Sequence, residues 1–115
     1  MADLPRLIEI HLAAAREDER GRSAERLLHD GPLRQSVLAL TAGTELAEHN
    51  APDAASLQVL VGRVSITGMD PAEVAAGQLV VLTHERHAVL ALEDSVFLLT
   101  TVTGVGQAAD APQGT

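Results

Sequence analysis

Histidine offers this chain more chemistry than any other residue type. The chain has five histidines but no cysteine and no lysine, which excludes thiolate chemistry and a lysine-bearing phosphate loop. His49, His84 and His87 lie where apolar segments begin or turn, and imidazole nitrogens in such places can bind Fe, Mn, Ni or Zn. The serines include no G-x-S-x-G nucleophile elbow. His11 and His29 are expected on the surface.

The composition of the chain limits the classes of partner. Its 115 residues fit one domain, and Phe97 is the one aromatic residue, so the core must be aliphatic. A formal net charge of −8 opposes binding to nucleic acid or anionic lipid. No apolar run approaches the ~20 residues of a membrane span, and the N-terminus does not resemble a signal peptide. We expect a cytoplasmic protein that binds neither nucleic acid nor a membrane.

The elements that position these histidines are predicted to be short strands preceded by one helix. Residues 3–15 form the helix, because Asp3 can cap it and Leu4, Ile8 and Leu12 share one face. We expect residues 1–26 to be this helix plus a charged connector, 27–103 a barrel, and 104–115 a disordered tail. The expected strands, separated by glycine and polar turns as in all-β barrels, are 33–40, 57–61, 64–67, 79–82, 87–92 and 96–102.

Two details of these strands can be tested against a structure. Gly62 predicts a tight hairpin between 57–61 and 64–67. Several strands are apolar on both faces, the run 79–82 being one of them. One face can line the barrel, and the other then needs a second sheet, the helix or a partner chain to cover it. Because a barrel of this size cannot cover both faces by itself, we expect a homodimer.

The spacing of glycine and histidine resembles the two motifs of the cupin family. In the first motif Gly43 is followed by five residues and then His49, and Gly62 closes the motif. In the second, Gly77 precedes an apolar strand and a turn that leads to His87. The chain is thus similar to small bacterial single-domain cupins of the RmlC-like superfamily. The resemblance implies an all-β double-stranded β-helix, a jelly-roll-like barrel, with a short N-terminal helix and both histidines at one mouth.

Most of the metal ligands that this resemblance implies are missing. Cupin metal sites typically use two histidines and a glutamate from the first motif and one histidine from the second. Here Ala51 stands at the second histidine position and Ala55 at the glutamate position. Two imidazoles alone make a poorly defined site, and His84 would be the third ligand. We therefore expect no resident cofactor, with a divalent metal (Fe, Mn, Ni or Zn) as the alternative.

Three functions remain open at this point. The favoured one is a non-enzymatic cupin that binds a small apolar ligand or serves as a dimeric regulatory or stress-related module. Its barrel mouth would be marked by His49, Gln58, Arg86 and His87. The second is a metal-dependent dioxygenase or isomerase that uses His49, His84 and His87, and the third an interaction protein with a filled barrel. Without a metal, replacing His49 or His87 by alanine should cost one hydrogen bond, about 0.5–1.5 kcal/mol.

Overall fold

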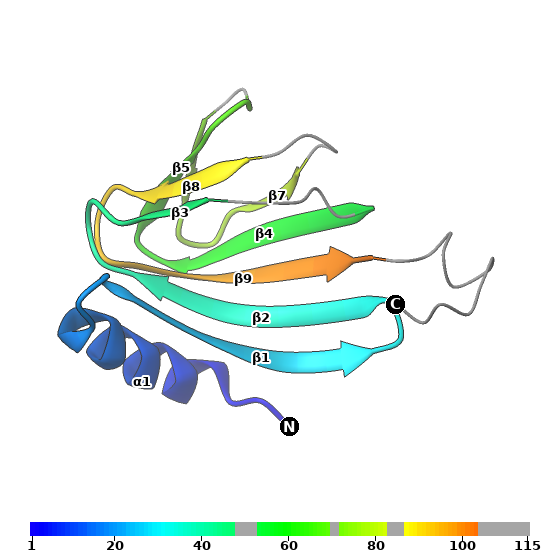
Figure 1. The fold of residues 1–115 in the computed structure, drawn as a ribbon, viewed down its shortest axis with the longest axis horizontal. Helices are drawn as coiled ribbons and strands as arrows, with labels where there is room; N and C mark the ends of the chain where they lie inside the picture. The colour runs from blue at the N-terminus through cyan, green and yellow to red at the C-terminus, as the bar shows by residue number, and fades with distance from the viewer. Residues whose placement is uncertain (48–52, 70–71, 83–86, 104–115) are drawn as a thin grey trace.

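The chain folds into two facing antiparallel sheets with a helix on the outside of the larger one (Figure 1). The computed structural model describes residues 1–47, 53–69, 72–82 and 87–103. The large sheet has the strand order β1 (Arg22–Asp30), β2 (Leu33–Leu40), β9 (Ser95–Val102), β4 (Ala54–Val61) and β7 (Leu79–Leu82). The small sheet has the order β3 (Glu45–Ala47), β8 (Ala88–Ala91), β5 (Arg63–Ile66) and β6 (Glu73–Ala75). The predicted all-β class is confirmed.

The helix α1 (Leu4–Glu17) begins where the sequence predicts. Asp3 is its N-cap, and the carboxylate of Asp3 accepts a hydrogen bond from the Arg6 backbone N–H at 3.3 Å. The segment 16–26, expected to be a charged connector, instead ends the helix and begins β1. The charged residues suggested a solvated connector, but β1 is an edge strand, and its side chains are mostly exposed. Strand β1 therefore begins at Arg22, inside the segment that was expected to be a connector.

Two apolar clusters explain why several strands are hydrophobic on both faces. The interior cluster lies between the sheets and is centred on Phe97, Leu40 and Leu57, all fully buried. The second cluster lies between α1 and the outer face of the large sheet, where Val96 packs. Strand β9 shows the division, because Val96 points to the helix side and Phe97 to the interior. The helix thus covers part of the outer face of the large sheet, which would be exposed in a barrel without a helix.

Gly62 turns the chain between the sheets and does not form a hairpin. Strand β4 belongs to the large sheet and β5 to the small one, and the two strands are not paired. The prediction of a hairpin is therefore wrong. Gly62 has φ +87°, and a Cβ there would collide with the Ser95 hydroxyl and the Asp94 carbonyl. This corner needs glycine for both reasons. The local sequence does not distinguish such a corner between two sheets from a hairpin within one sheet.

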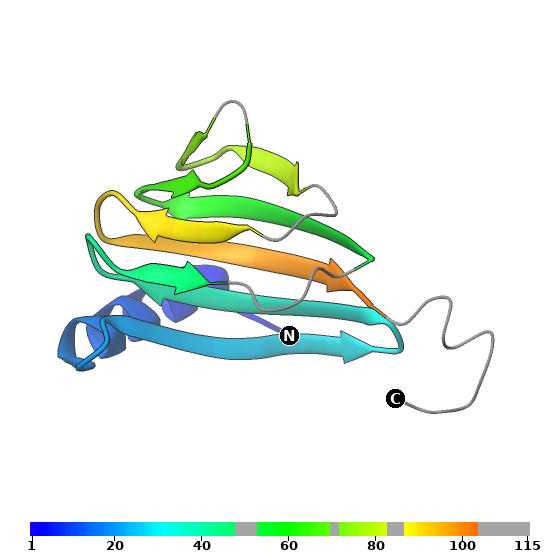
Figure 2. The ribbon, with the colours of Figure 1, turned by 45° about the horizontal axis from the view of Figure 1, so that its top comes forward.

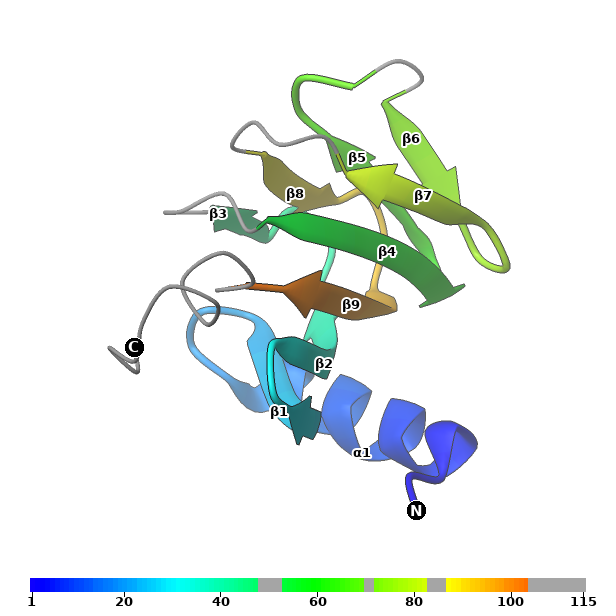
Figure 3. The same ribbon diagram turned by 90° about the vertical axis from the view of Figure 1, so that its right-hand side faces the viewer.

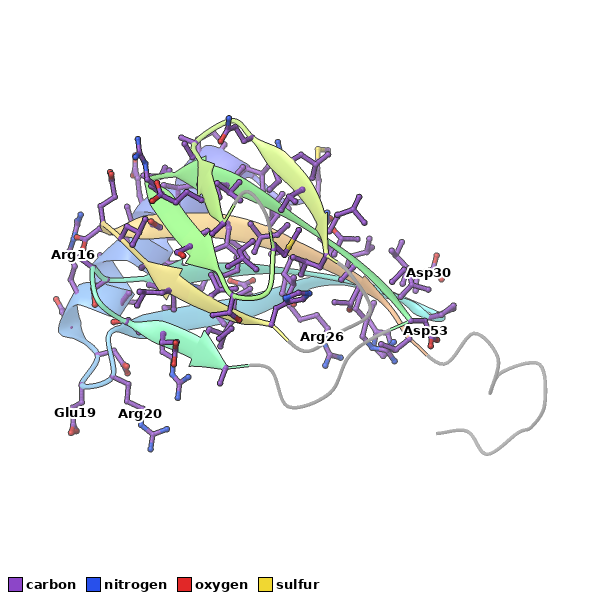
Figure 4. All side chains as sticks on the ribbon, turned by 90° about the horizontal axis from the view of Figure 1, so that it is seen from above. Arg16, Glu19, Arg20, Arg26, Asp30 and Asp53 are labelled. Atoms are coloured by element: carbon purple, nitrogen blue, oxygen red, sulfur yellow. The ribbon has the colours of Figure 1, made fainter. Side chains whose placement is uncertain are left out.

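The two ends of the barrel differ in character. At one end, which we call the mouth, β2, β4 and β8 begin while β5, β7 and β9 end (Figures 2 and 3). Seen from above, Asp30 and Asp53 lie at this end, whereas Arg16, Glu19 and Arg20 lie at the opposite end (Figure 4). The opposite end is closed by the Gly62 corner and by Ser95, whose hydroxyl accepts from the Arg63 N–H at 3.0 Å.

Candidate ligand site at the barrel mouth

His87 is the predicted site residue that the structure describes most fully. It directly precedes β8, and only 3% of its surface is exposed. Its Nδ1 lies 2.6 Å from the carbonyl oxygen of Thr67, at the end of β5. Since a carbonyl only accepts, Nδ1 carries the proton in this contact. The hydrogen bond therefore fixes the orientation of the ring.

The backbone around Thr67 is built to hold this imidazole. Thr67 and Ala88 are tied twice: the Thr67 N–H donates to the Ala88 carbonyl at 3.0 Å, and the Ala88 N–H donates to the Thr67 hydroxyl at 2.9 Å. Gly68 follows with φ +77°, and a Cβ there would lie 3.3 Å from His87 Nδ1. These contacts join β5 to β8 at the mouth and fix the ring by geometry.

Arg34 brings a positive charge to the same end of the barrel. Along β2, Leu38 and Leu40 pack in the interior cluster, and strand alternation puts Arg34 on their face. Its guanidinium donates to the Thr103 hydroxyl at 2.9 Å and to the Pro32 carbonyl at 3.4 Å. Sequence reasoning missed Arg34, although its even spacing from Leu38 and Leu40 indicated an inward position.

Apolar side chains make up much of the wall near the mouth. Ala55, the second residue of β4, pairs with Leu82 at the end of β7, and both are buried in the interior cluster. Met69 and Leu99 pack against the same cluster. The described residues at this end therefore combine an apolar wall with a buried imidazole and a half-buried guanidinium.

The other predicted site residues fall in two groups. Gln58 lies between buried Leu57 and Val59 on β4 and is exposed, so it lies on the outer face of the large sheet. This position is a correction to its expected place at the mouth. His49, His84 and Arg86, like the tail 104–115, lie outside the described residues.

The described residues do not fit a cupin metal centre. Ala55, at the position where the resemblance implies a glutamate ligand, is inward and buried, but its methyl group can bind no metal. Within residues 1–47, 53–69, 72–82 and 87–103, no group of three or more histidine, cysteine or acidic side chains could hold a metal ion. His87 is the one predicted ligand that this part of the chain supplies.

A second histidine, His11, was expected on the surface but is buried. His11 is 7% exposed, with Nδ1 2.7 Å from the Ser23 hydroxyl and Nε2 2.9 Å from a Glu25 carboxylate oxygen. These contacts fasten α1 to β1. The signal was present in the sequence, because His11 lies three residues after Ile8 and four before buried Ala15, on the apolar face of the helix.

Asp94 fastens the closed end. Its carboxylate accepts from the Ala42 backbone N–H at 2.9 Å and from Arg16 Nε at 3.0 Å. The hydrogen bond from Ala42 and then the one from Arg16 hold the pKa of Asp94 below its ordinary value. The end of α1 is thereby joined to the turn before β9, far from the mouth.

Comparison with known proteins identifies the fold. No protein-family model matches the sequence, and no curated protein does. A conserved protein of unknown function from Streptococcus pyogenes is 29% identical, over 75% of this chain and 77% of that one, with a TM-score of 0.65. The cupin domain of an XRE-family transcriptional regulator from Enterobacter cloacae is 16% identical, over 69% of this chain and 93% of that one, with a TM-score of 0.59. Salicylate 1,2-dioxygenase from Pseudaminobacter salicylatoxidans is 19% identical, over 91% of this chain but 35% of that one, with a TM-score of 0.71.

These similarities define the class of protein. The chain has the cupin fold, and other similar structures are likewise described as cupins. It resembles in particular the small cupin proteins of bacteria, as the spacing of its glycines and histidines indicated. Among the residues that the structure describes, no helix is long and apolar enough to cross a membrane.

Proposed function

We propose that this protein is a non-enzymatic cupin that binds a small molecule with an apolar body and an anionic group at the barrel mouth. The observation that carries the proposal is Ala55, which replaces a carboxylate ligand by a buried methyl group facing the interior. An anionic group suits Arg34, whose guanidinium donates to two neutral oxygens, the Thr103 hydroxyl and the Pro32 carbonyl. The apolar body suits the wall formed by Leu82, Met69 and Leu99.

A stability assay with simple carboxylates tests this proposal. The probes are straight-chain carboxylates of increasing length and, for each, the uncharged primary alcohol. A ligand that binds the folded state raises the stability by about 2.7 kcal/mol at 100 times its dissociation constant. We expect the carboxylates to raise the melting temperature more than the alcohols, and Arg34→Gln to remove the difference.

The matched control is Arg20→Gln, because Arg20 is exposed at the opposite end of the barrel (Figure 4). It should leave the response to carboxylates unchanged. If no carboxylate raises the melting temperature of the wild type, or if both arginine variants behave alike, the anionic site at the mouth is refuted.

A metal-dependent dioxygenase or isomerase is the second candidate, with His49, His84 and His87 as ligands. The observation in its favour is that His87 donates Nδ1–H to a backbone carbonyl, the arrangement that orients metal-binding histidines. The test is elemental analysis of protein purified without a histidine tag and then dialysed. A stoichiometric metal that His87→Ala abolishes would establish this candidate and overturn the first.

A regulatory role in the cell is the remaining form of the proposal. Its support is the likeness to a cupin domain of a transcriptional regulator, which at this identity is a likeness of fold. In such a role the ligand at the mouth would be the signal. Ligand binding by a protein that remains free of metal after dialysis is compatible with this regulatory role and with a role limited to binding.

A further inference from the structure

An irregularity in strand β1 brings Arg26 and His29 to the same face of the large sheet. Residues three apart in a regular strand point to opposite faces. Here the register shifts between Arg26 and Leu28, and Leu27 has no partner in the ladder to β2. With this extra residue the two side chains meet, and Arg26 Nη1 lies 3.2 Å from His29 Nδ1. A bulge thus aims a guanidinium and an imidazole at one place.

Arg34, the arginine of the mouth, lies on this face as well. His29 is opposite Arg34 in the ladder, and Arg26 is opposite Ser36, two residues further along β2. Opposite and diagonal neighbours on one face of an antiparallel pair are within reach of long side chains. Strands β1 and β2 run side by side at the edge of the large sheet (Figures 1 and 2), and Arg26 projects on the side away from α1 (Figure 4). The mouth therefore has two guanidinium groups on neighbouring strands.

The charges of these two arginines are not balanced by a carboxylate within the part of the chain that the structure describes. Asp30 follows His29 directly and alternates to the opposite face of β1. The ion pairs between described residues join His11 with Glu25, Arg16 with Asp94 and Arg63 with Glu73. Like charges on neighbouring strands destabilise a sheet. An anion bound between Arg26 and Arg34 would remove this repulsion.

We propose that the anionic group bound at the mouth is a phosphate monoester, held by Arg26, His29 and Arg34. This inference rests on the proposed function and names the class of its ligand. A phosphate monoester carries about −1.5 to −2 charges at pH 7 and offers three acceptor oxygens. Two guanidinium groups match that charge, whereas one would suffice for a carboxylate. The phosphate belongs to a small molecule, because the net charge of −8 opposes a polynucleotide.

His29 contributes a third donor and holds Arg26 in place. A guanidinium only donates, so Nδ1 of His29 is the acceptor in their contact, and Nε2 carries the proton of the ring. The imidazole thereby offers an N–H to the anion without adding a third positive charge. Arg26 and His29 are exposed, so replacing either one leaves the two apolar clusters intact.

Calorimetric titration with three probes that share a hexyl chain tests the proposal. Hexyl phosphate is dianionic at pH 7.5, its methyl ester is a monoanionic phosphate diester, and heptanoate is a carboxylate. We expect hexyl phosphate to bind at least about tenfold more tightly than either of the others. Arg26→Gln should reduce this ratio to about one, and His29→Leu should reduce it at least about threefold.

The matched control is Arg22→Gln, which removes the same charge from the same face of the same strand. Arg22 is opposite Leu40, four residues from Arg26, so it lies about 13 Å further along β1. That distance exceeds the screening length of about 8 Å at physiological salt. The control should therefore bind hexyl phosphate as the wild type does. Equal losses with Arg22→Gln and Arg26→Gln would show an effect of net charge alone and overturn the proposal.

The same titrations separate this inference from the function on which it rests. If heptanoate binds and depends on Arg34, but hexyl phosphate binds no more tightly, the anionic site stands and the phosphate class is wrong. Hexyl phosphate and its methyl ester binding equally would likewise overturn the requirement for two charges. If none of the three probes binds, the anionic site itself is refuted, and this inference with it.

Discussion

Replacing His87 should destabilise the protein more than the loss of one exposed hydrogen bond would. The ring is 3% exposed and donates to the Thr67 carbonyl, so His87→Ala removes this buried hydrogen bond at a cost of roughly 1–3 kcal/mol. The variant also leaves the space of the ring empty, which costs about 1 kcal/mol more. The total of about 2–4 kcal/mol is a large part of the roughly 6–17 kcal/mol expected for a chain of this length. The figure exceeds the 0.5–1.5 kcal/mol that the sequence suggested, because burial was not visible there.

His87→Asn is the matched variant for this prediction. The asparagine amide nitrogen lies near the position of Nδ1 and can still donate to the Thr67 carbonyl. It should therefore recover about 1–2 kcal/mol of the loss seen with alanine. Urea denaturation followed by circular dichroism is the assay, because the chain has no tryptophan or tyrosine to report by fluorescence.

Two results would refute the reasoning. Equal losses for the alanine and asparagine variants would show that the hydrogen bond to Thr67 contributes nothing. A fall of several degrees in the wild-type melting temperature with EDTA, reversed by one divalent ion and absent from His87→Ala, would show that His87 acts as a metal ligand. Nitrogen NMR of the ring offers an independent check, since the neutral form should carry its proton on Nδ1.

Other predictions concern the closed end and the core. Gly62→Ala should cost several kcal/mol of stability because its Cβ would collide with backbone atoms. Gly43 has φ +88° but open space around it, so Gly43→Ala should cost only about 1–2 kcal/mol. Urea denaturation of the two variants compares these costs. Asp94→Asn should lower stability by less than about 1 kcal/mol, since the ion pair is more than a third exposed. Because the folded-state pKa of Asp94 is depressed, its contribution is present above pH ~4 and disappears as the pH falls through that pKa, which melts at several pH values test. Phe97→Ala should cost about 3–5 kcal/mol in the same melts, and a loss below 1 kcal/mol would contradict its central place in the interior.

The regular elements were predictable because each is set by a local pattern. Helix α1 followed from the spacing of Leu4, Ile8 and Leu12, and β2 and β9 from long apolar runs. Short strands of three residues, β3 and β6, give no such pattern and were missed. Strand β1 was missed because an edge strand carries the charges of a solvated segment.

The site was less predictable because it depends on pairings between distant segments. Gly62 has the local signal of a hairpin, but which sheet each strand joins is decided by β7, β8 and β9. Gln58 shows a different failure. The alternation of Leu57, Gln58 and Val59 indicates an outward side chain, and the motif argument placed it at the mouth in spite of that pattern. The buried contact between His87 and Thr67 joins residues twenty apart, and no periodicity reveals it.

The position of β9 has a consequence for how the chain folds as it is synthesised. The last strand lies in the middle of the large sheet, between β2 and β4, and it carries Phe97 on one face and Val96 on the other. Until residue 102 has left the ribosome, β2 and β4 have no common neighbour, and α1 lacks part of its packing surface. Helix and early strands must therefore wait with apolar surfaces uncovered. Pairing between β2 and β9 closes a loop that runs from residue 41 to residue 94, nearly half the chain, which favours folding in milliseconds to seconds.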